Sequence, residues 1–149
     1  MSNSTETNTK SPTQAVISLT IPRIRRLTPV LVVDSVEPCI RFWIDRFGFK
    51  SANEVPGSDG KLIFASVEKD GVELMYQTLS SVISEHPDNA ADLAGRSIAL
   101  FLTVDDLDAV EKVVAGAPVI KPRHKTFYGS TELYVREPGG NMVGFAQML

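Results

Sequence analysis

Glu73 is the first candidate for chemistry in this sequence, because it is an acidic residue inside a strand-like segment. The alternation of side chains along a strand puts Glu73 on the face opposite Val72, Leu74 and Tyr76. A carboxylate on such a face can hold a cationic ligand, and where it is desolvated it can act as a general base. The competing interpretation is a solvated carboxylate at the edge of a groove.

The two histidines and the single cysteine are weaker candidates. His124 lies in the segment KPRHKTFYG, which we expect at the mouth of a cavity, where a lone histidine is either solvated or a ligand or base. His86 lies in a polar linker. Cys39 and Trp43 fall on the apolar side of an expected helix, so we expect both in the core. One cysteine allows no intrachain disulfide, which fits a reducing compartment.

The composition is that of a globular chain. Of its 149 residues, 43% are hydrophobic and 22% are charged, which suits one domain with its own core. The 18 acidic residues outnumber the 15 basic ones, so general binding to nucleic acid or to an anionic membrane is disfavoured. No apolar run approaches the roughly 20 residues of a membrane span. We therefore expect a cytoplasmic protein with neither a nucleic-acid nor a membrane partner.

Residues 1–24 are expected to form a disordered tail, and residues 25–149 a single folded domain. The first part of the tail has no aromatic side chain and almost no apolar one, so it cannot offset the entropy cost of ordering. The arginines of the run RIRR, just before the first strand, are expected to be solvated. The domain divides into a first module at about 25–79, a linker at 80–96 and a second module at about 97–149.

Each module has the element order β-α-β-β-β. Apolar alternation, helical periodicity and turn residues separate the elements. The expected strands are 27–33, 49–55, 62–68 and 72–79 in the first module, and 98–104, 119–120, 131–136 and 142–148 in the second. The expected helices are 34–47 and 105–115, and the linker is expected to hold one further helical turn.

Local signals predict the ends of several elements. Asp34 is expected as the N-cap of the first helix with Glu37 as its capping-box partner, and Gly48 is expected to end that helix. Asp70-Gly71 predicts a two-residue hairpin turn. Pro122 is expected to end the short strand before it, because proline has no N–H for a sheet.

One shift along the chain relates the two modules. It carries Asp34 onto Asp105 and Val72 onto Val143, and these residues begin equivalent elements. Each module has one apolar sheet face under its helix, and two modules would bury those faces together. The other sheet faces would then curve around a cavity.

The cavity face is expected to bind a small molecule. A two-residue turn after Lys69 places Glu73 opposite Glu68, and Met75 opposite Ser66. The expected cavity-facing residues are Leu62, Phe64, Ser66, Glu68, Glu73, Met75, Gln77, Phe101 and Thr103. An apolar and aromatic wall with few polar groups is typical of small-molecule pockets.

A second aromatic group precedes and enters the strand at 131–136. Tyr128 is expected to border the cavity, where its flat ring could stack on a planar ligand. The facing of Tyr134 stays open, because the turn PGGN fixes its register and the length of that turn cannot be read from the sequence.

Two segments resemble the signatures of the vicinal oxygen chelate superfamily, namely PVLVVDSVEPCIRFWIDRFGFK at 29–50 and YGSTELYVREPGGNMVGFAQ at 128–147. That superfamily includes glyoxalase I, extradiol dioxygenases and bleomycin-resistance proteins. The amino-acid sequences of the two segments are most similar to the bleomycin-resistance branch. The resemblance covers about 27–147. It implies an α+β fold in which two βαβββ modules form a curved, partly open eight-stranded barrel.

The resemblance also implies where a divalent metal would bind. Four inward-facing side chains hold it in the family's enzymes, and the matching positions here are Thr28, Glu73, Ala99 and Gly144. The shift that relates the modules carries Thr28 onto Ala99 and Glu73 onto Gly144. Alanine and glycine have no ligating side chain, so we expect neither a metal nor another cofactor.

We expect a metal-independent small-molecule-binding protein of the bleomycin-resistance type, which sequesters a hydrophobic or cationic compound. The resemblance also implies a homodimer. The expected ligand-binding residues are Thr28, Phe64, Glu73, Met75, Phe101, Thr103 and Tyr128.

Two alternatives stay open. The first is a lyase or isomerase of the same superfamily, with Glu73 as general base and Tyr128 or His124 assisting. The second is a scaffold domain without a ligand, which predicts that the large cavity-facing side chains fill the cavity.

Overall fold

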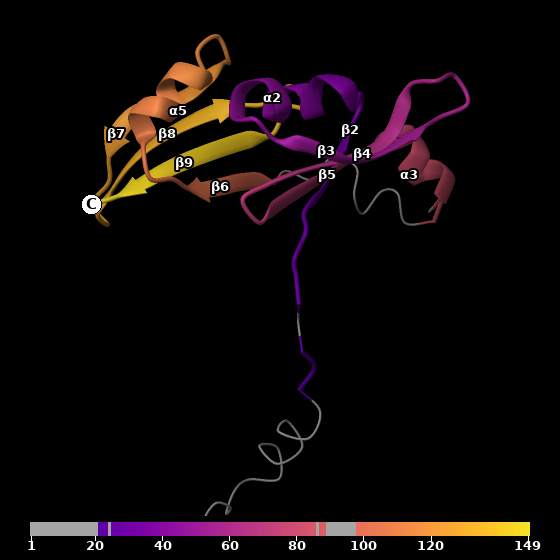
Figure 1. Cartoon of the computed structure of the whole chain (residues 1–149), viewed down its shortest axis with the longest axis horizontal. Helices are drawn as coiled ribbons and strands as arrows, with labels where there is room; N and C mark the ends of the chain where they lie inside the picture. The colour runs from indigo at the N-terminus through magenta and orange to yellow at the C-terminus, as the bar shows by residue number, and fades with distance from the viewer. Residues whose placement is uncertain (1–20, 24, 86, 89–97) are drawn as a thin grey trace, which may run out of the picture.

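The computed structural model describes residues 21–23, 25–85, 87–88 and 98–149, and in these it contains two mixed sheets. Each sheet has four strands in the same spatial order, β2-β5-β4-β3 and β6-β9-β8-β7 (Figure 1). The strands are β2 (Val30–Val33), β3 (Lys50–Pro56), β4 (Leu62–Lys69), β5 (Val72–Thr78), β6 (Ala99–Thr103), β7 (Val119–Lys125), β8 (Ser130–Arg136) and β9 (Met142–Met148). The helices are α2 (Glu37–Phe47), α3 (Leu79–Glu85) and α5 (Leu107–Val113).

The predicted fold class is confirmed. Both modules have the order β-α-β-β-β, with the first strand parallel to the last and the remaining pairs antiparallel. The two sheets are not joined into a closed barrel, so the arrangement is an open one. Residues 1–20 and 24 of the predicted tail and His86 lie outside the described residues, as does most of the linker. In the described part of the linker, α3 is longer than the predicted single turn.

The hairpin between β4 and β5 has the register predicted from its turn. Asp70 and Gly71 have φ angles of 53° and 79°, which a tight two-residue turn requires at both positions. Glu68 is therefore opposite Glu73, and Ser66 is opposite Met75.

The predicted cap of the first helix is wrong. The N-cap is Val36 and makes no side-chain hydrogen bond, so neither Asp34 nor a capping box starts the helix. The Glu37 carboxylate instead accepts a hydrogen bond of 2.7 Å from the backbone N–H of Leu62, which ties the helix start to β4. The predicted end is confirmed, because Gly48 caps the helix in the left-handed conformation.

The predicted end of a strand at Pro122 is also wrong, because β7 continues to Lys125. Two register shifts allow this: Val119 is opposite Val135, Lys121 opposite Tyr134, and His124 opposite Glu132. Since β7 is at the edge of its sheet, a residue without an N–H is tolerated there.

The pairing of the last strands corrects the repeat derived from the sequence. In the first sheet Val30 is paired with Met75. The shift that carries Asp34 onto Asp105 also carries Val30 onto Phe101 and Met75 onto Ala146, so it predicts that Phe101 is paired with Ala146. The partner of Phe101 is instead Gly144. The counterpart of Met75 is therefore Gly144, and the counterpart of Glu73 is Met142.

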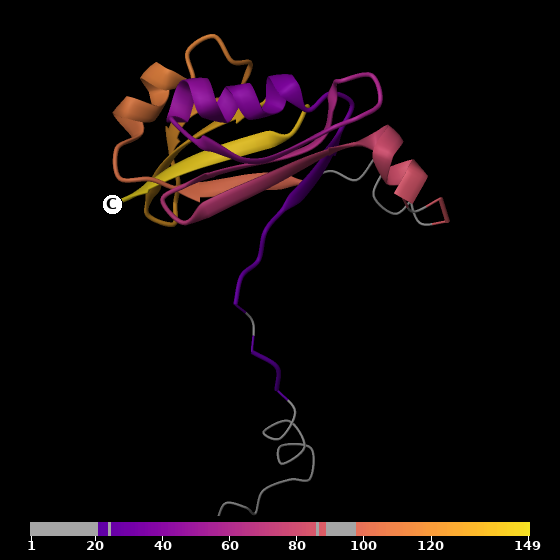
Figure 2. The ribbon, with the colours of Figure 1, turned by 45° about the vertical axis from the view of Figure 1, so that its right-hand side comes forward.

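Helix α2 joins the two modules through one hydrophobic core. It lies over β9 as well as over strands of its own sheet (Figure 2). The Phe47 ring stacks on Phe145 of β9 with centroids 5.3 Å apart. The Arg46 guanidinium donates to the carbonyls of Val113 and Ala115, at 2.9 and 2.8 Å, which fixes the helix end to the segment after α5.

A buried hydrogen-bond chain also crosses between the modules. Trp43 Nε1 donates to Tyr76 Oη at 2.9 Å, and Tyr76 Oη donates to Glu137 Oε2 at 2.7 Å. Glu137 Oε1 accepts from the backbone and side-chain N–H groups of Asn141, at 2.7 and 3.1 Å. Burial and the Glu137 charge raise the pKa of Tyr76 far above its ordinary value, so Tyr76 remains a donor.

Cys39 is fully buried in the same core, as predicted. Burial, and then the charge of Glu137, raise the pKa of its thiol to about 12. The thiol is therefore protonated and unreactive at neutral pH. Across the described ranges, no helix combines the length and the apolar character needed to cross a membrane.

We predict that Tyr76→Phe lowers the free energy of unfolding by about 1–3 kcal/mol, because it leaves Trp43 Nε1 and Glu137 Oε2 without their buried partner. Urea denaturation measures the change. Tyr128→Phe is the matched control and should cost less, because the Tyr128 ring is exposed and the carboxylate that accepts its hydroxyl, Glu132, keeps two other hydroxyl donors. Equal losses in the two variants would contradict the prediction.

Candidate functional site

A buried carboxylate, Glu132, lies at the centre of a cluster of hydroxyl groups on β8. Glu132 is only 1% exposed. Its Oε2 accepts hydrogen bonds of 2.8 Å from Tyr128 Oη and of 2.8 Å from Ser130 Oγ. Its Oε1 accepts one of 2.9 Å from Tyr134 Oη. All three donors are neutral hydroxyls that keep the carboxylate fixed in position.

Strand alternation explains why these side chains gather. Leu133 and Val135 face the hydrophobic core, so Ser130, Glu132 and Tyr134 point to the opposite face of β8. The facing of Tyr134, which the sequence left open, is thereby resolved.

Gly144 makes the position of Tyr134 possible. The two residues are opposite each other on β8 and β9. A Cβ atom on Gly144 would lie 2.4 Å from Tyr134 Cε2, which is far inside van der Waals contact. The Tyr134 ring therefore lies directly over the backbone of β9 and reaches Glu132 from there.

His124 extends the cluster onto the edge strand. It is opposite Glu132 in the pairing of β7 with β8, and its ring stacks on Tyr134 with centroids 6.3 Å apart. Its Nδ1 is 2.8 Å from the carbonyl oxygen of Pro122. A carbonyl only accepts, so Nδ1 carries the hydrogen and Nε2 of the neutral ring is an acceptor.

The hydrogen bonds also determine the charge state of the cluster. Burial raises the pKa of Glu132, but the hydroxyls of Ser130, Tyr128 and Tyr134 and the nearby His124 outweigh it, so the pKa lies below its ordinary value. Burial, together with the bond to Glu132, raises the pKa of Tyr134 to about 12. The bond to Glu132 likewise raises the pKa of Tyr128. The cluster therefore holds a charged carboxylate and two protonated phenols at neutral pH.

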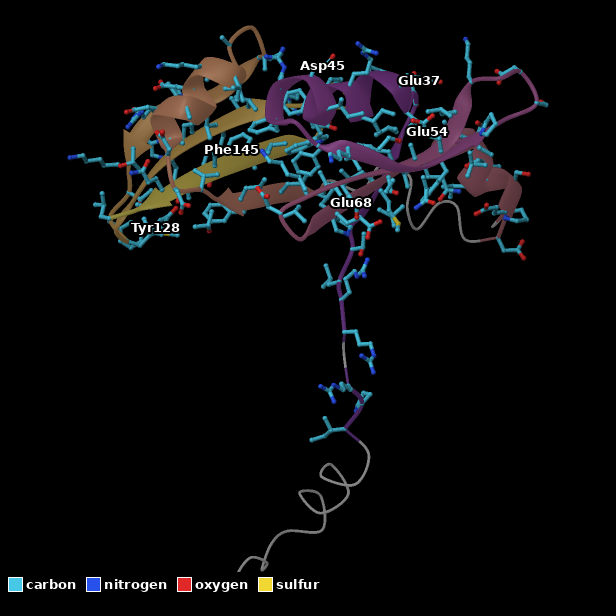
Figure 3. All side chains as sticks on the ribbon, in the orientation of Figure 1. Glu37, Asp45, Glu54, Glu68, Tyr128 and Phe145 are labelled. Carbon is cyan, nitrogen blue, oxygen red and sulfur yellow. The ribbon has the colours of Figure 1, made fainter. Side chains whose placement is uncertain are left out.

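This cluster forms the base of a cavity of about 520 Å³, which we call the Glu132 cavity. Ile120, Met142 and the rings of Tyr134 and Tyr128 are among the apolar and aromatic groups that line it. Phe127, which is 99% exposed, packs edge-on against Tyr128 at 5.2 Å between ring centroids. Tyr128 lies near the C-terminus, at the end of the second sheet away from α3 (Figure 3).

The Glu132 cavity is suited to binding a flat ligand rather than to proton transfer. Both tyrosine hydroxyls donate toward Glu132, so their remaining lone pairs are acceptors for a ligand. A carboxylate has roughly four acceptor positions, and the three hydroxyls already occupy most of them on Glu132. Its lowered pKa further makes it a weak base.

Glu73, the main candidate from the sequence, lies in a different cavity of about 390 Å³ together with Thr28. Its carboxylate binds Arg26 with an N–O distance of 2.8 Å, and its side chain is 13% exposed. The Arg26 side chain is 72% exposed, as expected for a solvated arginine, and it also forms this ion pair. The Glu73 carboxylate thus already holds a cation from its own chain.

The structure divides the predicted ligand-binding residues among separate places. Tyr128 lines the Glu132 cavity, and Thr28 and Glu73 line the cavity beside Arg26. The other four line neither of these two cavities, and Phe101 is 52% exposed. These four are Phe64, Met75, Phe101 and Thr103. Their roles, like the predicted homodimer, stay predictions.

The four positions where the resemblance places a metal do not fit one. Ala99 and Gly144 offer no ligating atom, the Tyr134 ring covers Gly144, and Arg26 engages Glu73. The corrected repeat replaces Gly144 by Met142 as the counterpart of Glu73, and a thioether is a poor ligand for a hard cation. Within the part of the chain that the structure describes, no three His, Cys, Asp or Glu side chains form a group that could hold a metal ion.

Glu132 was not among the site residues predicted from the sequence. One signal was present, because Glu132 is an acidic residue on the same strand face as Ser130 and Tyr134. Its partners on β7 could not be found in this way, because two register shifts decide which residues of β7 face it.

Comparison with known proteins identifies a family and several relatives. The sequence profile of the Glyoxalase/Bleomycin resistance protein/Dioxygenase superfamily matches residues 23–145. An uncharacterised protein of Mycobacterium bovis is 30% identical over 118 residues, which cover 77% of this chain and 78% of that protein. An uncharacterised protein of Mycobacterium tuberculosis is also 30% identical over 118 residues and is covered to 69%.

Solved structures share the fold at lower identity. A glyoxalase/bleomycin resistance protein/dioxygenase family enzyme from Burkholderia phytofirmans has a TM-score of 0.66 at 19% identity, covering 82% of this chain and 97% of its own. TioX from Micromonospora has a TM-score of 0.66 at 19% identity, covering 85% and 100%. A lactoylglutathione lyase from Agrobacterium tumefaciens has a TM-score of 0.64 at 20% identity, covering 85% and 95%.

We predict that Gly144→Ala displaces the Tyr134 ring and lowers the free energy of unfolding by about 1–3 kcal/mol. The new methyl group would occupy the space of that ring. Chemical denaturation measures the loss in the wild-type background and in a Tyr134→Ala background, where no ring is present. A loss of the same size in both backgrounds would show that the overlap with Tyr134 is not its cause.

We predict a pH dependence that Glu132 causes. Because folding lowers its pKa below 4.5, its stabilising effect is complete above that pH and is lost as the pH falls through the lower, folded pKa. The stability difference between wild type and Glu132→Gln should therefore shrink between about pH 6 and about pH 3 in urea titrations. Glu68→Gln, at an exposed carboxyl group, is the control and should differ little from wild type at either pH. A difference that stays constant or grows at low pH would contradict the prediction.

Proposed function

The chain belongs to the Glyoxalase/Bleomycin resistance protein/Dioxygenase superfamily, and within it we propose that the chain is a metal-independent binding protein for a small, flat, hydrophobic compound. The observation that carries this proposal is the Glu132 carboxylate, which accepts hydrogen bonds from three hydroxyl groups and lines an aromatic cavity. The two tyrosine hydroxyls present acceptor atoms to a ligand, and neither they nor the Glu132 carboxylate is a free base or nucleophile.

Binding is better supported than catalysis. The superfamily name covers both enzymes and resistance proteins, so membership alone does not decide between them. A lyase or isomerase that uses Glu73 would need a carboxylate free to take a proton, but Arg26 binds that carboxylate. In the Glu132 cavity the tyrosines stay protonated and Glu132 is a weak base.

A hydrophobic ligand is better supported than a cationic one. An ion pair between a cationic ligand and Glu132 would need direct access to the carboxylate oxygens, and hydroxyl donors occupy most of their acceptor positions. The cavity walls are aromatic and aliphatic, and flat rings stack well on tyrosine and histidine side chains. Sequestration of such a compound is the use that we infer from the bleomycin-resistance part of the family name.

We predict that the purified protein binds 2-naphthalenemethanol or 2-naphthoate, two flat bicyclic probes, and that the affinity is unchanged after dialysis against EDTA. Isothermal titration calorimetry measures both affinities. Glu132→Gln should weaken binding of the bound probe by about tenfold, because it disturbs the alignment of both tyrosine hydroxyls.

Glu73→Gln is the matched control for this experiment, since it makes the same chemical change in the other cavity. It should leave the affinity unchanged. Binding that Glu73→Gln abolishes and Glu132→Gln does not would assign the ligand to the cavity beside Arg26. Binding that EDTA abolishes would contradict metal independence.

A further inference from the structure

We propose that the ligand of the Glu132 cavity carries an anionic group at its outer end, which Lys121 and Lys125 of β7 hold. This inference rests on the proposed binding function and names the chemical class of its ligand. The class is a flat aromatic body with a carboxylate, sulfonate or phosphate group.

The register shifts of β7 send its basic side chains to two different faces of the sheet. Lys121 is opposite Tyr134 and His124 is opposite Glu132, so both face the cavity. Arg123, which lies between them, reaches α5 and binds Asp108 at 2.7 Å and Glu111 at 3.0 Å. One acidic pair on α5 therefore already satisfies the arginine of this strand.

The two lysines of β7 have no such partner. Both line the Glu132 cavity and both are exposed. Lys121 starts on the cavity face, whereas Lys125 is opposite Thr131, so it starts on the other face and borders the cavity at the open edge of β7. Among the described residues, neither Lys121 nor Lys125 forms a hydrogen bond or ion pair through its ammonium group. Their charges are thus available to a bound molecule.

The charges around the cavity do not balance. Glu132 is the one carboxylate among the residues that line it, and its oxygens are turned toward three hydroxyl groups. The two ammonium groups at the rim therefore leave an excess of positive charge. An anionic ligand would be attracted to this rim and oriented by it.

The cavity accordingly presents different chemistry along its depth. A ligand meets phenol oxygens and His124 at the base, aromatic faces along the wall, and ammonium groups at the rim. A ligand that fits this arrangement has an N–H, an O–H or an apolar edge at the end that enters the cavity, and its acidic group at the end that stays outside. This order also explains why a buried carboxylate can coexist with an anionic ligand, since the two ends are separate.

A matched series of naphthalenes tests the inference by isothermal titration calorimetry. The probes are 2-naphthoate, 2-naphthalenemethanol and 2-naphthylmethylammonium, which share one ring system and differ in charge. We expect 2-naphthoate to bind about tenfold more tightly than the alcohol, and the ammonium compound to bind most weakly. Raising the salt concentration should narrow the difference between naphthoate and the alcohol.

Variants then locate the effect. Lys121→Met and Lys125→Met keep much of the side-chain length without the charge. Lys121→Met should weaken naphthoate binding by roughly fivefold and Lys125→Met by less, because Lys125 borders the cavity only at the edge of β7, and each variant should affect naphthoate more than the alcohol. Lys112→Met, at the end of α5, is the control and should change neither affinity.

The outcomes separate this inference from the proposed function. Equal binding of naphthoate and the alcohol, or tighter binding of the ammonium compound, would overturn the anionic class. If, in either case, Glu132→Gln weakened the binding of the probe that binds, the Glu132 cavity would remain the binding site and only the anionic class of the ligand would be wrong. Failure of all three probes to bind would overturn both proposals for flat ligands of this size.

Discussion

The packing of α2 against both sheets is the constraint on which the rest of the molecule depends. Its aromatic side chains bury one face of each sheet in a common core, and the stacking of Phe47 on Phe145 is one direct contact between the modules. The buried bond from Tyr76 to Glu137 adds a polar link at the same junction. Because the helices cover these faces, polar and aromatic side chains of β8 can only gather on the other side.

The chain uses two buried carboxylates in different ways. Glu137 accepts hydrogen bonds from Tyr76 and from Asn141 in its own turn, so it serves to lock a loop into the core. Glu132 accepts only side-chain hydroxyls, and two of these belong to rings that line an open cavity. The first arrangement stabilises the fold, whereas the second orients a surface that a ligand can reach.

The features that could be predicted from the sequence are those that short-range signals determine, such as turns, helix ends and the order of the elements. Asp70-Gly71 specifies a tight turn, and that turn alone fixed the correct register of β4 with β5. The helix-ending Gly48 and the element order of both modules were also readable. Single-sequence signals could not show that Arg26 reaches Glu73 across 47 positions, or that Glu37 caps no helix but binds the backbone of Leu62.

The candidate site could be predicted only in part from the sequence, for a related reason. Tyr128 was identified because a flat side chain before a strand is conspicuous in the sequence. Glu132, the carboxylate at the centre of the cluster, was not identified. Its role depends on three hydroxyl groups that only the folded chain brings close to it. The pairing of Phe101 with Gly144 likewise depends on the register of β6 against β9. A single sequence shift between the modules does not predict that register.

The irregularity of β7 has a consequence beyond the cavity. An outermost strand with free backbone groups is a template on which another chain can add a strand. The offsets in β7, its proline and its charged side chains interrupt that template, and β3 at the edge of the other sheet has offsets of its own and ends in Pro56. These two edge strands therefore disfavour the addition of a strand from another chain, and β2 and β6 form the opposite edges of the two sheets.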